Sequence, residues 1–234
     1  MAKRFNVSAL TIRRDLEMFE KQGFVNRFYG GAKVIDGAIA EDPAKKSKKV
    51  LTGDDETETK ERLRVAKLAA TLVEDGDTIF INSSRTAIAM ISCIHKKKVT
   101  VITNNGHALE LPRDVGVTIV LTGGEATKGK CSLLGDVALS TIKKIKADKC
   151  FIGVSGVSTD GKISTAVLQE TMINKLMIAQ TKHEVVILAD GSRIGKANNF
   201  VIGDVSKITH IVTDKRANKA TLEQFQKDGV RVMV

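Results

Sequence analysis

Short apolar runs recur along the chain from residue 78 onwards, and polar or amphipathic stretches separate them. Each run has the length of a buried strand. We expect strands at TIFI (78–81), VTVI (99–102), VTIVL (117–121), KCFIGV (149–154), EVVILA (184–189), THIVT (209–213) and VRVMV (230–234). Helical patterns begin at Thr59 and recur near 86–95, 105–111, 133–145, 166–181 and 219–227. Strands that alternate with helices predict an α/β domain with a mostly parallel, Rossmann-like sheet.

A different pattern occupies the beginning of the chain. Ile12, Leu16 and Phe19 recur at helical spacing and form one apolar stripe. Ser8 is the expected N-cap of this helix, and Gly23 is its expected end. The polar side chains beside the stripe include two adjacent arginines within two turns of the helix start, where a recognition helix enters a major groove. A solvated surface helix gives the same pattern, so periodicity alone leaves both interpretations open.

Segments on either side complete a helix-turn-helix outline with a wing. The segment at 2–5 is typical of the end of an earlier helix, and 24–34 alternates like a two-stranded hairpin. The pattern therefore predicts a small winged head at 1–34 and a larger domain at 59–234. The polar stretch at 35–58 has the composition of a linker.

Small and polar residues follow five of the expected strands. They are Asn82-Ser83-Ser84-Arg85-Thr86, Thr103-Asn104-Asn105, Thr122-Gly123-Gly124, Ser155-Gly156-Val157-Ser158 and Asp190-Gly191-Ser192-Arg193. Any one of them is explained by a turn or a helix cap. Because the carboxyl ends of parallel strands share one edge of a sheet, together they predict a polar pocket. Hydroxyls, backbone N–H groups and the guanidinium of Arg85 favour an anionic ligand there.

The overall charge supports an anionic partner. The formal net charge is +10, which favours nucleic acid or a phosphorylated small molecule. Trp is absent and there is one Tyr, so stacking of single-stranded bases is not the expected activity. Cys93, Cys131 and Cys150 show no C-x-x-C spacing, and the chain has neither a signal-peptide core nor a membrane-length apolar run. We therefore expect no disulfide framework or zinc site, and a cytoplasmic protein.

The segment VSALTIRRDLEMFEKQGFVNRFYGGA (7–32) resembles the DNA-binding signature of DeoR-family bacterial transcriptional regulators. In that family V-S-x-x-T-I-R-R-D-L is followed by L-x-x-x-G and R-x-x-G-G-A. Phe19 here replaces the usual Leu, and Tyr29 replaces a frequent His. The resemblance implies DNA contacts from Ser8, Thr11, Arg13, Arg14, Arg27 and Lys33. Family members have a full helix before the segment matching 2–5, so we expect a partial winged head without its first helix.

Later segments are similar to successive motifs of the DeoR sensor domain. They are DGDTIFINSSRTA, VTVITNN, VTIVLTGG, ADKCFIGVSGVS and VVILADGSRIG. That domain is similar in fold to ribose-5-phosphate isomerase, and family members sense phosphorylated sugars or related metabolites. The family's D-S-G-T-T is replaced here by residues 82–86, and its D-x-S-K by residues 190–193. The implied effector-binding residues are Asn82, Ser83, Ser84, Arg85, Thr86, Asn104, Gly123, Gly124, Ser155, Lys175, Asp190 and Arg193.

The resemblance implies a repressor of a carbohydrate-metabolism operon. Its expected partners are a double-stranded DNA operator, a phosphorylated sugar effector and further copies of itself, as a dimer or tetramer. A sugar-phosphate isomerase-like enzyme is the alternative, and a sensor that acts only by binding a partner protein is a third possibility. The isomerases need a carboxylate base after the fourth strand, but 153–158 contains no acid and Asp160 falls in an expected turn. We therefore expect no enzymatic activity, cofactor or metal.

Overall fold

The computed structural model describes residues 7–21, 24–28, 31–34, 56–127 and 131–234. The chain divides into two compact units, 1–46 and 47–234, which we call the head and the sensor domain. The predicted linker lies outside the described residues as far as residue 55, as does the segment at 2–5. No helix in the described part of the chain is long and apolar enough to cross a membrane.

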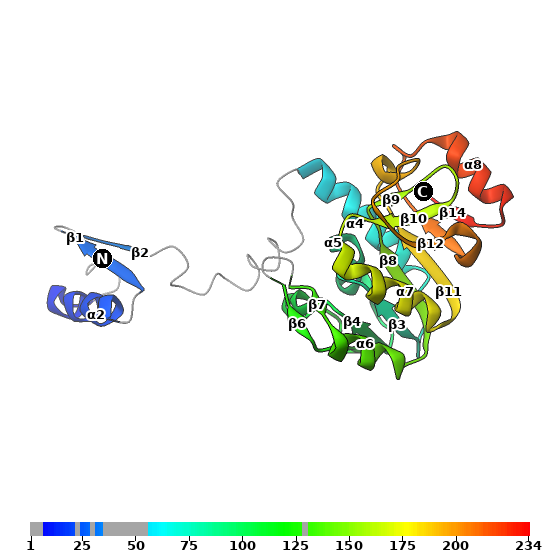
Figure 1. The fold of residues 1–234 in the computed structure, drawn as a ribbon. Helices are drawn as coiled ribbons and strands as arrows, with labels where there is room; N and C mark the ends of the chain where they lie inside the picture. Colours follow the sequence, from blue (N-terminus) through cyan, green and yellow to red (C-terminus); the bar gives the residue numbers. More distant parts are fainter. Residues whose placement is uncertain (1–6, 22–23, 29–30, 35–55, 128–130) are drawn as a thin grey trace. The chain divides into compact units, whose positions relative to one another are not determined.

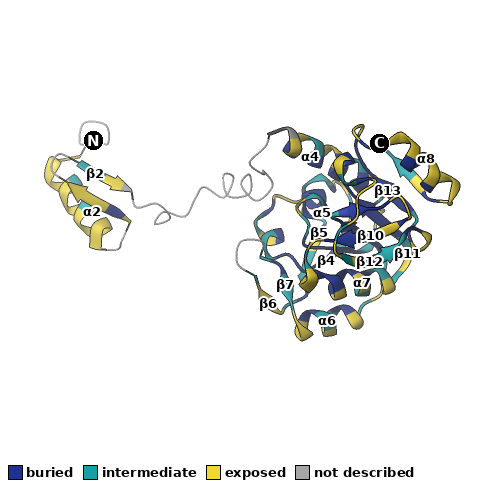
Figure 2. Cartoon of the chain, turned by 45° about the horizontal axis from the view of Figure 1, so that its top comes forward, coloured by how far each residue is buried: buried dark blue, intermediate teal, exposed yellow. Residues whose placement is uncertain are grey.

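The head contains helix α2 (Ala9–Lys21) and the antiparallel strands β1 (Val25–Phe28) and β2 (Gly31–Val34). The helix begins where the sequence predicts, because Ser8 Oγ accepts a hydrogen bond from Thr11 N at 3.1 Å. None of the residues of α2 is buried, and Figure 2 shows the helix mostly in yellow. The predicted recognition helix and wing are therefore confirmed as elements.

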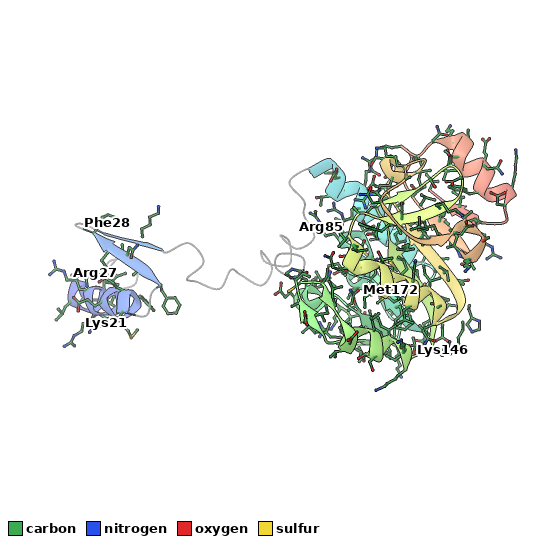
Figure 3. All side chains as sticks on the ribbon, in the orientation of Figure 1. Lys21, Arg27, Phe28, Arg85, Lys146 and Met172 are labelled. Carbon is green, nitrogen blue, oxygen red and sulfur yellow. The ribbon has the colours of Figure 1, made fainter. Side chains whose placement is uncertain are left out.

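Two contacts join α2 to the wing. The rings of Phe19 and Phe24 meet edge to face with centroids 6.3 Å apart. The side chain of Arg27 in β1 pairs with Glu17 at 3.1 Å and lies 3.8 Å from Glu20. Figure 3 shows Arg27 over the helix. These contacts fix the strand against the helix.

The sensor domain is built on a seven-stranded parallel sheet with the order β14-β13-β11-β8-β3-β4-β5 (Figure 1). The strands are β3 (Thr78–Ile81), β4 (Val99–Thr103), β5 (Val117–Leu121), β8 (Ala147–Gly153), β11 (Thr181–Leu188), β13 (His210–Val212) and β14 (Arg231–Met233). All seven predicted strands are thus confirmed. Burial on both faces explains the apolar runs of the central strands β3, β4 and β8, whereas the edge strands β5 and β14 are mostly half-buried or exposed.

Helices cover the two faces of this sheet. They are α4 (Glu56–Ala70), α5 (Arg85–Ala89), α6 (Asp136–Lys143), α7 (Thr171–Ala179) and α8 (Lys219–Lys227). One core packs Phe80 of β3 with residues of α6, α7 and α8. The other packs Ile79 and Ile81 with residues of α4, α5 and the 3₁₀ helix η1 (Met90–Cys93). The alternation along β3 sends successive side chains into opposite cores.

Several smaller elements differ from the sequence prediction. A second sheet contains β9 (Gly156–Val157), β10 (Lys162–Thr165) and β12 (Phe200–Asp204), none of which the periodicity indicated. The predicted helix at 133–145 is wrong at its beginning, because β7 (Leu133–Leu134) pairs there with β6 (Glu125–Ala126). Gly135, with φ of +84°, separates β7 from α6.

Two predicted helices are shorter or tighter than expected. The pattern at 86–95 becomes α5 followed by η1, and the pattern at 105–111 becomes the 3₁₀ helix η2 (Gly106–Glu110). The pattern at 166–181 divides into η3 (Leu168–Glu170) and α7. The remaining 3₁₀ helices are η4 (Gly191–Arg193) and η5 (Val205–Lys207).

Candidate functional site

The strand order of the sheet reverses between β3 and β8. From β3 the chain proceeds to β4 and β5 on one side, whereas β8, β11, β13 and β14 follow one another on the other side. Ligands of open parallel sheets bind where the strand order reverses, beyond the carboxyl ends of the strands. The loop at 82–86 follows β3 and therefore lies at this switch point, as the sequence pattern predicts.

The side chain of Asn82 links three elements at the switch point. Its Nδ2 donates to Gly153 O at 2.9 Å and to Asn174 Oδ1 at 3.0 Å. Its Oδ1 accepts from Gly153 N at 3.0 Å, and the residue is 1% exposed. The hydrogen-bonding capacity of Asn82 is therefore used to join β3, β8 and α7. These hydrogen bonds give Asn82 a positioning role, and its expected contact with an effector stays a prediction.

The serines beside Asn82 are also engaged. Ser83 Oγ donates to the buried Glu170 Oε1 at 3.2 Å, and Ser132 Oγ donates to the same oxygen at 3.2 Å. Ser84 Oγ accepts from Ala87 N at 3.2 Å and caps α5. Because α5 has only five residues, we attribute little anion binding to its dipole. Sequence reasoning missed Glu170, although this acid directly precedes α7.

The loops after β4 and β5 pack tightly on neighbouring backbone. Asn104 Nδ2 donates to Leu133 O at 3.2 Å, whereas its buried Oδ1 has no hydrogen-bond partner among the described residues. Gly123 and Gly124 have φ of +70° and +107°, and a Cβ on Gly124 would lie 2.2 Å from Leu134 O. Gly124 is thus required for packing against β7. We expected glycine there for a different reason, namely the close approach of a ligand.

Three arginines gather beyond the strand ends. Arg85 is exposed at the first residue of α5, and Figure 3 shows it at the surface of the sensor domain. Arg193 Nε pairs with Asp190 Oδ2 at 2.6 Å in the turn after β11. Arg62 of α4, which sequence reasoning missed, is 9% exposed and lies within electrostatic range of both arginines. Burial, and then Arg85, lower the pKa of the Arg62 guanidinium.

Lys175 does not join these arginines. It lines a separate groove of about 810 Å³ together with Thr181, His183 and Asp204. That groove follows the amino-terminal half of β11, away from the carboxyl edge of the sheet. Successive positions on a helix point about 100° apart, so Asn174 faces Asn82 while Lys175 faces elsewhere. The structure thus places Lys175 in this groove, and its contact with an effector stays a prediction.

The remaining expected ligands hold local turns. Ser155 Oγ accepts from Ala166 N at 3.1 Å, and Thr86 is half-buried on α5. Asp190 Oδ1 accepts from Ser192 N at 3.1 Å and caps η4. In the described residues no group of three or more His, Cys, Asp and Glu side chains could hold a metal ion.

Gly153 allows the loops after β3 and β8 to touch, because a Cβ there would lie 2.4 Å from Ser84 Cβ. We expect Gly153→Ala to lower the free energy of unfolding by about 1–3 kcal/mol through overpacking. Urea unfolding measures this change. Gly203→Ala is the matched control, because its nearest neighbour would lie at 3.8 Å in ordinary contact. Equal stability of the two variants would contradict the close packing at the switch point.

Asp214 anchors the turn after β11 from the end of β13. This fully buried carboxylate accepts from Arg216 Nε at 2.9 Å, Arg216 Nη2 at 2.8 Å and Gly191 N at 2.8 Å. The hydrogen bonds from Arg216, followed by the backbone N–H groups, lower the pKa of Asp214 to about 2. Asp214 therefore holds Gly191, and with it η4, against β13.

A lowered pKa gives a pH-dependent contribution to stability. The Asp214 contribution is fully present above the ordinary pKa of 3.8 and is lost as the pH falls through about 2. We expect Asp214→Asn to lower the free energy of unfolding by about 2 kcal/mol at neutral pH. Urea unfolding from neutral pH downwards should show this difference shrinking below pH 4, unlike the exposed control Asp228→Asn. A difference independent of pH would contradict the assignment.

The head exposes basic side chains at the start of α2 and on the wing. Arg13 and Arg14 are exposed, as is Lys33 on the wing. Thr11 is exposed too, and its hydroxyl lies 2.8 Å from Ser8 Oγ, so Ser8 acts through the helix cap. Arg27, expected to contact phosphate, is instead paired with two glutamates of α2. These ion pairs hold the wing on the helix, and the expected contact of Arg27 with phosphate stays a prediction.

Comparisons with known proteins place both parts of the chain. The model of the DeoR C terminal sensor domain matches residues 57–215, and that of the DeoR-like helix-turn-helix domain matches residues 1–38. The HTH-type transcriptional repressor GlcR of Bacillus subtilis is 31% identical, with 97% of this chain and 85% of GlcR covered. The glycerol-3-phosphate regulon repressor of Escherichia coli is 27% identical, with coverages of 92% and 82%.

Solved structures give a weaker match. Ribose 5-phosphate isomerase A from Methanocaldococcus jannaschii aligns with a TM-score of 0.41 and 21% identity. The alignment covers 57% of this chain and 53% of the isomerase. At this level the likeness carries no inference about activity.

Proposed function

Because the chain belongs to the DeoR family of bacterial transcriptional regulators, we propose that it represses a carbohydrate-metabolism operon under the control of a phosphorylated sugar or related metabolite. One observation carries the proposal: a DNA-binding head and a sensor domain of this family occur on one chain. Two relatives are named as repressors, one of them of the glycerol-3-phosphate regulon. The protein would act in the bacterial cytoplasm on a double-stranded DNA operator.

The charges at the sheet switch point support a phosphorylated effector. Arg85 is exposed after β3, and Arg193, which is paired with Asp190, contributes a second guanidinium after β11, on the other side of β8. Guanidinium groups bind phosphate through paired, charge-assisted hydrogen bonds. Ser83, Ser84 and Asn82 are committed to internal hydrogen bonds, so in this proposal they shape the loop that presents Arg85.

Exposed apolar side chains support assembly into homo-oligomers. Val137 on α6, Met172 on α7 and Val201 on β12 are 61%, 59% and 46% exposed. Helix α7 packs against both α6 and β12, so these side chains belong to adjoining elements. Figure 3 shows Met172 on α7. Burying such a surface against a second copy would also pair two heads over symmetric half-sites.

We propose that the sensor domain is not an isomerase. The relatives named above are transcriptional regulators. Asp160 is the first acid along the chain after β8, and it hydrogen-bonds to Ser158 in its own turn. The buried Glu170 is held between two serine hydroxyls. Interconversion of ribose 5-phosphate and ribulose 5-phosphate above a control without protein would support the enzyme alternative.

The repressor proposal is tested in two steps. A thermal-shift screen of sugar and polyol phosphates identifies compounds that raise the melting temperature, since a ligand of the native state stabilises it. Fluorescence anisotropy with labelled promoter DNA then measures affinity with and without the best compound. We expect a change in DNA affinity that the unphosphorylated sugar does not produce. An affinity for promoter DNA no higher than for scrambled DNA would contradict the DNA-binding proposal.

A further inference from the structure

A groove of about 810 Å³ lies beside the amino-terminal half of β11 in the sensor domain. Helix α7, strand β11 and strand β12 bound it, and Figures 1 and 2 both show these elements side by side. The loops of the strand-end site lie at the carboxyl edge of the sheet, whereas this groove begins at Thr181, the first residue of β11. The groove is therefore a separate feature of the fold.

The residues that line the groove fall on regular faces of these elements. Helix α7 contributes its positions i, i+3 and i+4, which share one face of the helix and are Lys175, Ile178 and Ala179. Strand β11 contributes alternate residues, which lie on one face of the strand and are Thr181, His183 and Val185. Four consecutive residues of the edge strand β12, 201–204, complete the lining. The groove thus follows one helix face, one strand face and the length of an edge strand.

Apolar side chains form much of the lining. Val185 and Ile202 are buried, Ile178 is half-buried and Val201 is exposed. Small-molecule sites in proteins are concave, have volumes of about 300–1,000 Å³ and combine a largely apolar lining with a few polar groups. The groove therefore has the size and the lining of such a site.

The polar part of the lining is basic. Lys162, Lys175 and Lys207 line the groove, together with the exposed His183. Asp204 is the only acid among the described residues that line it, and its Oδ2 lies 2.6 Å from Lys162 Nζ, so these two charges offset each other. Lys175 and Lys207 are exposed and form no ion pair with any described residue. Two ammonium groups therefore stand beside an apolar lining without a counter-charge from the described residues.

We propose that this groove binds a small organic anion with an apolar body. Its anionic group contacts Lys175 and Lys207, and its body packs on Ile178 and the apolar residues of β11 and β12. The inference goes beyond the proposed function, because it assigns a second ligand of different chemistry to a different part of the domain. Helix α7 serves both places, since Asn174 accepts from Asn82 at 3.0 Å at the switch point and the next residue lines the groove.

The test titrates the full chain with anilinonaphthalenesulfonate, an apolar anion whose fluorescence rises when it leaves water. We expect saturable binding. Lys175→Gln and Lys207→Gln should each weaken it about two- to fivefold, the range of a partly solvated ion pair, and the double variant should weaken it more than either. Phenylnaphthylamine, which lacks the sulfonate, should bind more weakly and should not respond to these substitutions.

A bulky substitution tests the groove itself. Ala179 is exposed and lines the groove at the end of α7, so the ring of Ala179→Phe should occupy part of the volume and abolish saturable binding. Ala220→Phe is the matched control, because this exposed residue lies on α8, which begins beyond the carboxyl end of β13. Lys67→Gln on α4, whose buried residues belong to the other core, controls for net charge. Melting temperatures without the probe show whether each variant is folded.

Three results would overturn the inference. The first is the absence of saturable binding to the wild type, whether a second copy of the chain covers the groove or nothing binds there. The second is equal binding of the charged and uncharged probes, or an affinity that neither Lys175→Gln nor Lys207→Gln changes more than Lys67→Gln does. The third is an equal effect of Ala179→Phe and Ala220→Phe, which would place the probe elsewhere on the protein.

Discussion

We expect Arg85→Gln to weaken the binding of a phosphorylated sugar about ten- to a hundredfold. A charge-assisted hydrogen bond contributes about 1.5–3 kcal/mol, which corresponds to this range of affinity. The exposed guanidinium at the first residue of α5 lies at the switch point of the sheet, beyond the carboxyl end of β3. The unphosphorylated sugar should bind the wild type much more weakly, and the substitution should barely affect it.

Calorimetry of both proteins with both ligands measures these affinities. Arg113→Gln is the matched control, because this exposed arginine precedes β5 and lies at the opposite edge of the sheet. Arg85→Lys should retain part of the affinity, since lysine keeps the charge without the planar donor pair. Equal losses for the phosphorylated and plain sugars would mean that Arg85 shapes the pocket and does not bind the phosphate.

The sheet of the sensor domain was predictable because its central strands are buried on both faces. The run TIFI contains the apolar residues that burial between two helix layers requires, and it matches β3 residue for residue. The run VTIVL likewise matches β5, although this edge strand is mostly half-buried. The small antiparallel sheet was not predictable in the same way. Strand β9 has only two residues, and β10 also pairs with β12, which comes after α7 and β11 in the chain.

The location of the candidate site was predictable, but the roles of its residues were not. Parallel strands bring their carboxyl ends to one edge, so the loops containing Asn82 and Arg193 had to lie along the same edge of the sheet. The hydrogen bonds of Asn82 go to Gly153 and Asn174, which only the folded chain places beside it. A motif can therefore indicate where a residue lies without showing whether its polar atoms remain available.

The roles of charged side chains were the hardest to predict. Arg62 lies on the buried stripe of α4, a visible signal because charged residues rarely occupy such positions unless they are paired. Lys175 matched a family position, yet the rotation of α7 directs its neighbour Asn174 to the switch point. Arg27 matched the family signature as well, but Glu17 and Glu20 are close enough on α2 to pair with it.

We expect Arg14→Ala to weaken binding to promoter DNA by about 1–3 kcal/mol, or about 5- to 150-fold, and to relax discrimination between promoter and scrambled DNA. Arg14 lies in the first turns of α2 and is exposed, which suits contact with a base edge in the major groove. Arg27, by contrast, is already paired with two glutamates of α2, which offset its charge.

Lys33→Ala provides the contrasting control, because this exposed wing residue is expected to contact phosphate, which carries no sequence information. It should weaken binding to promoter and scrambled DNA alike and reduce the salt dependence of binding by about one counterion. Anisotropy titrations of both variants on both DNAs at several salt concentrations separate the two roles. If Arg14→Ala lowers the two affinities equally, Arg14 contacts the backbone, and base recognition is then expected from the other exposed residues of the helix start, Thr11 or Arg13.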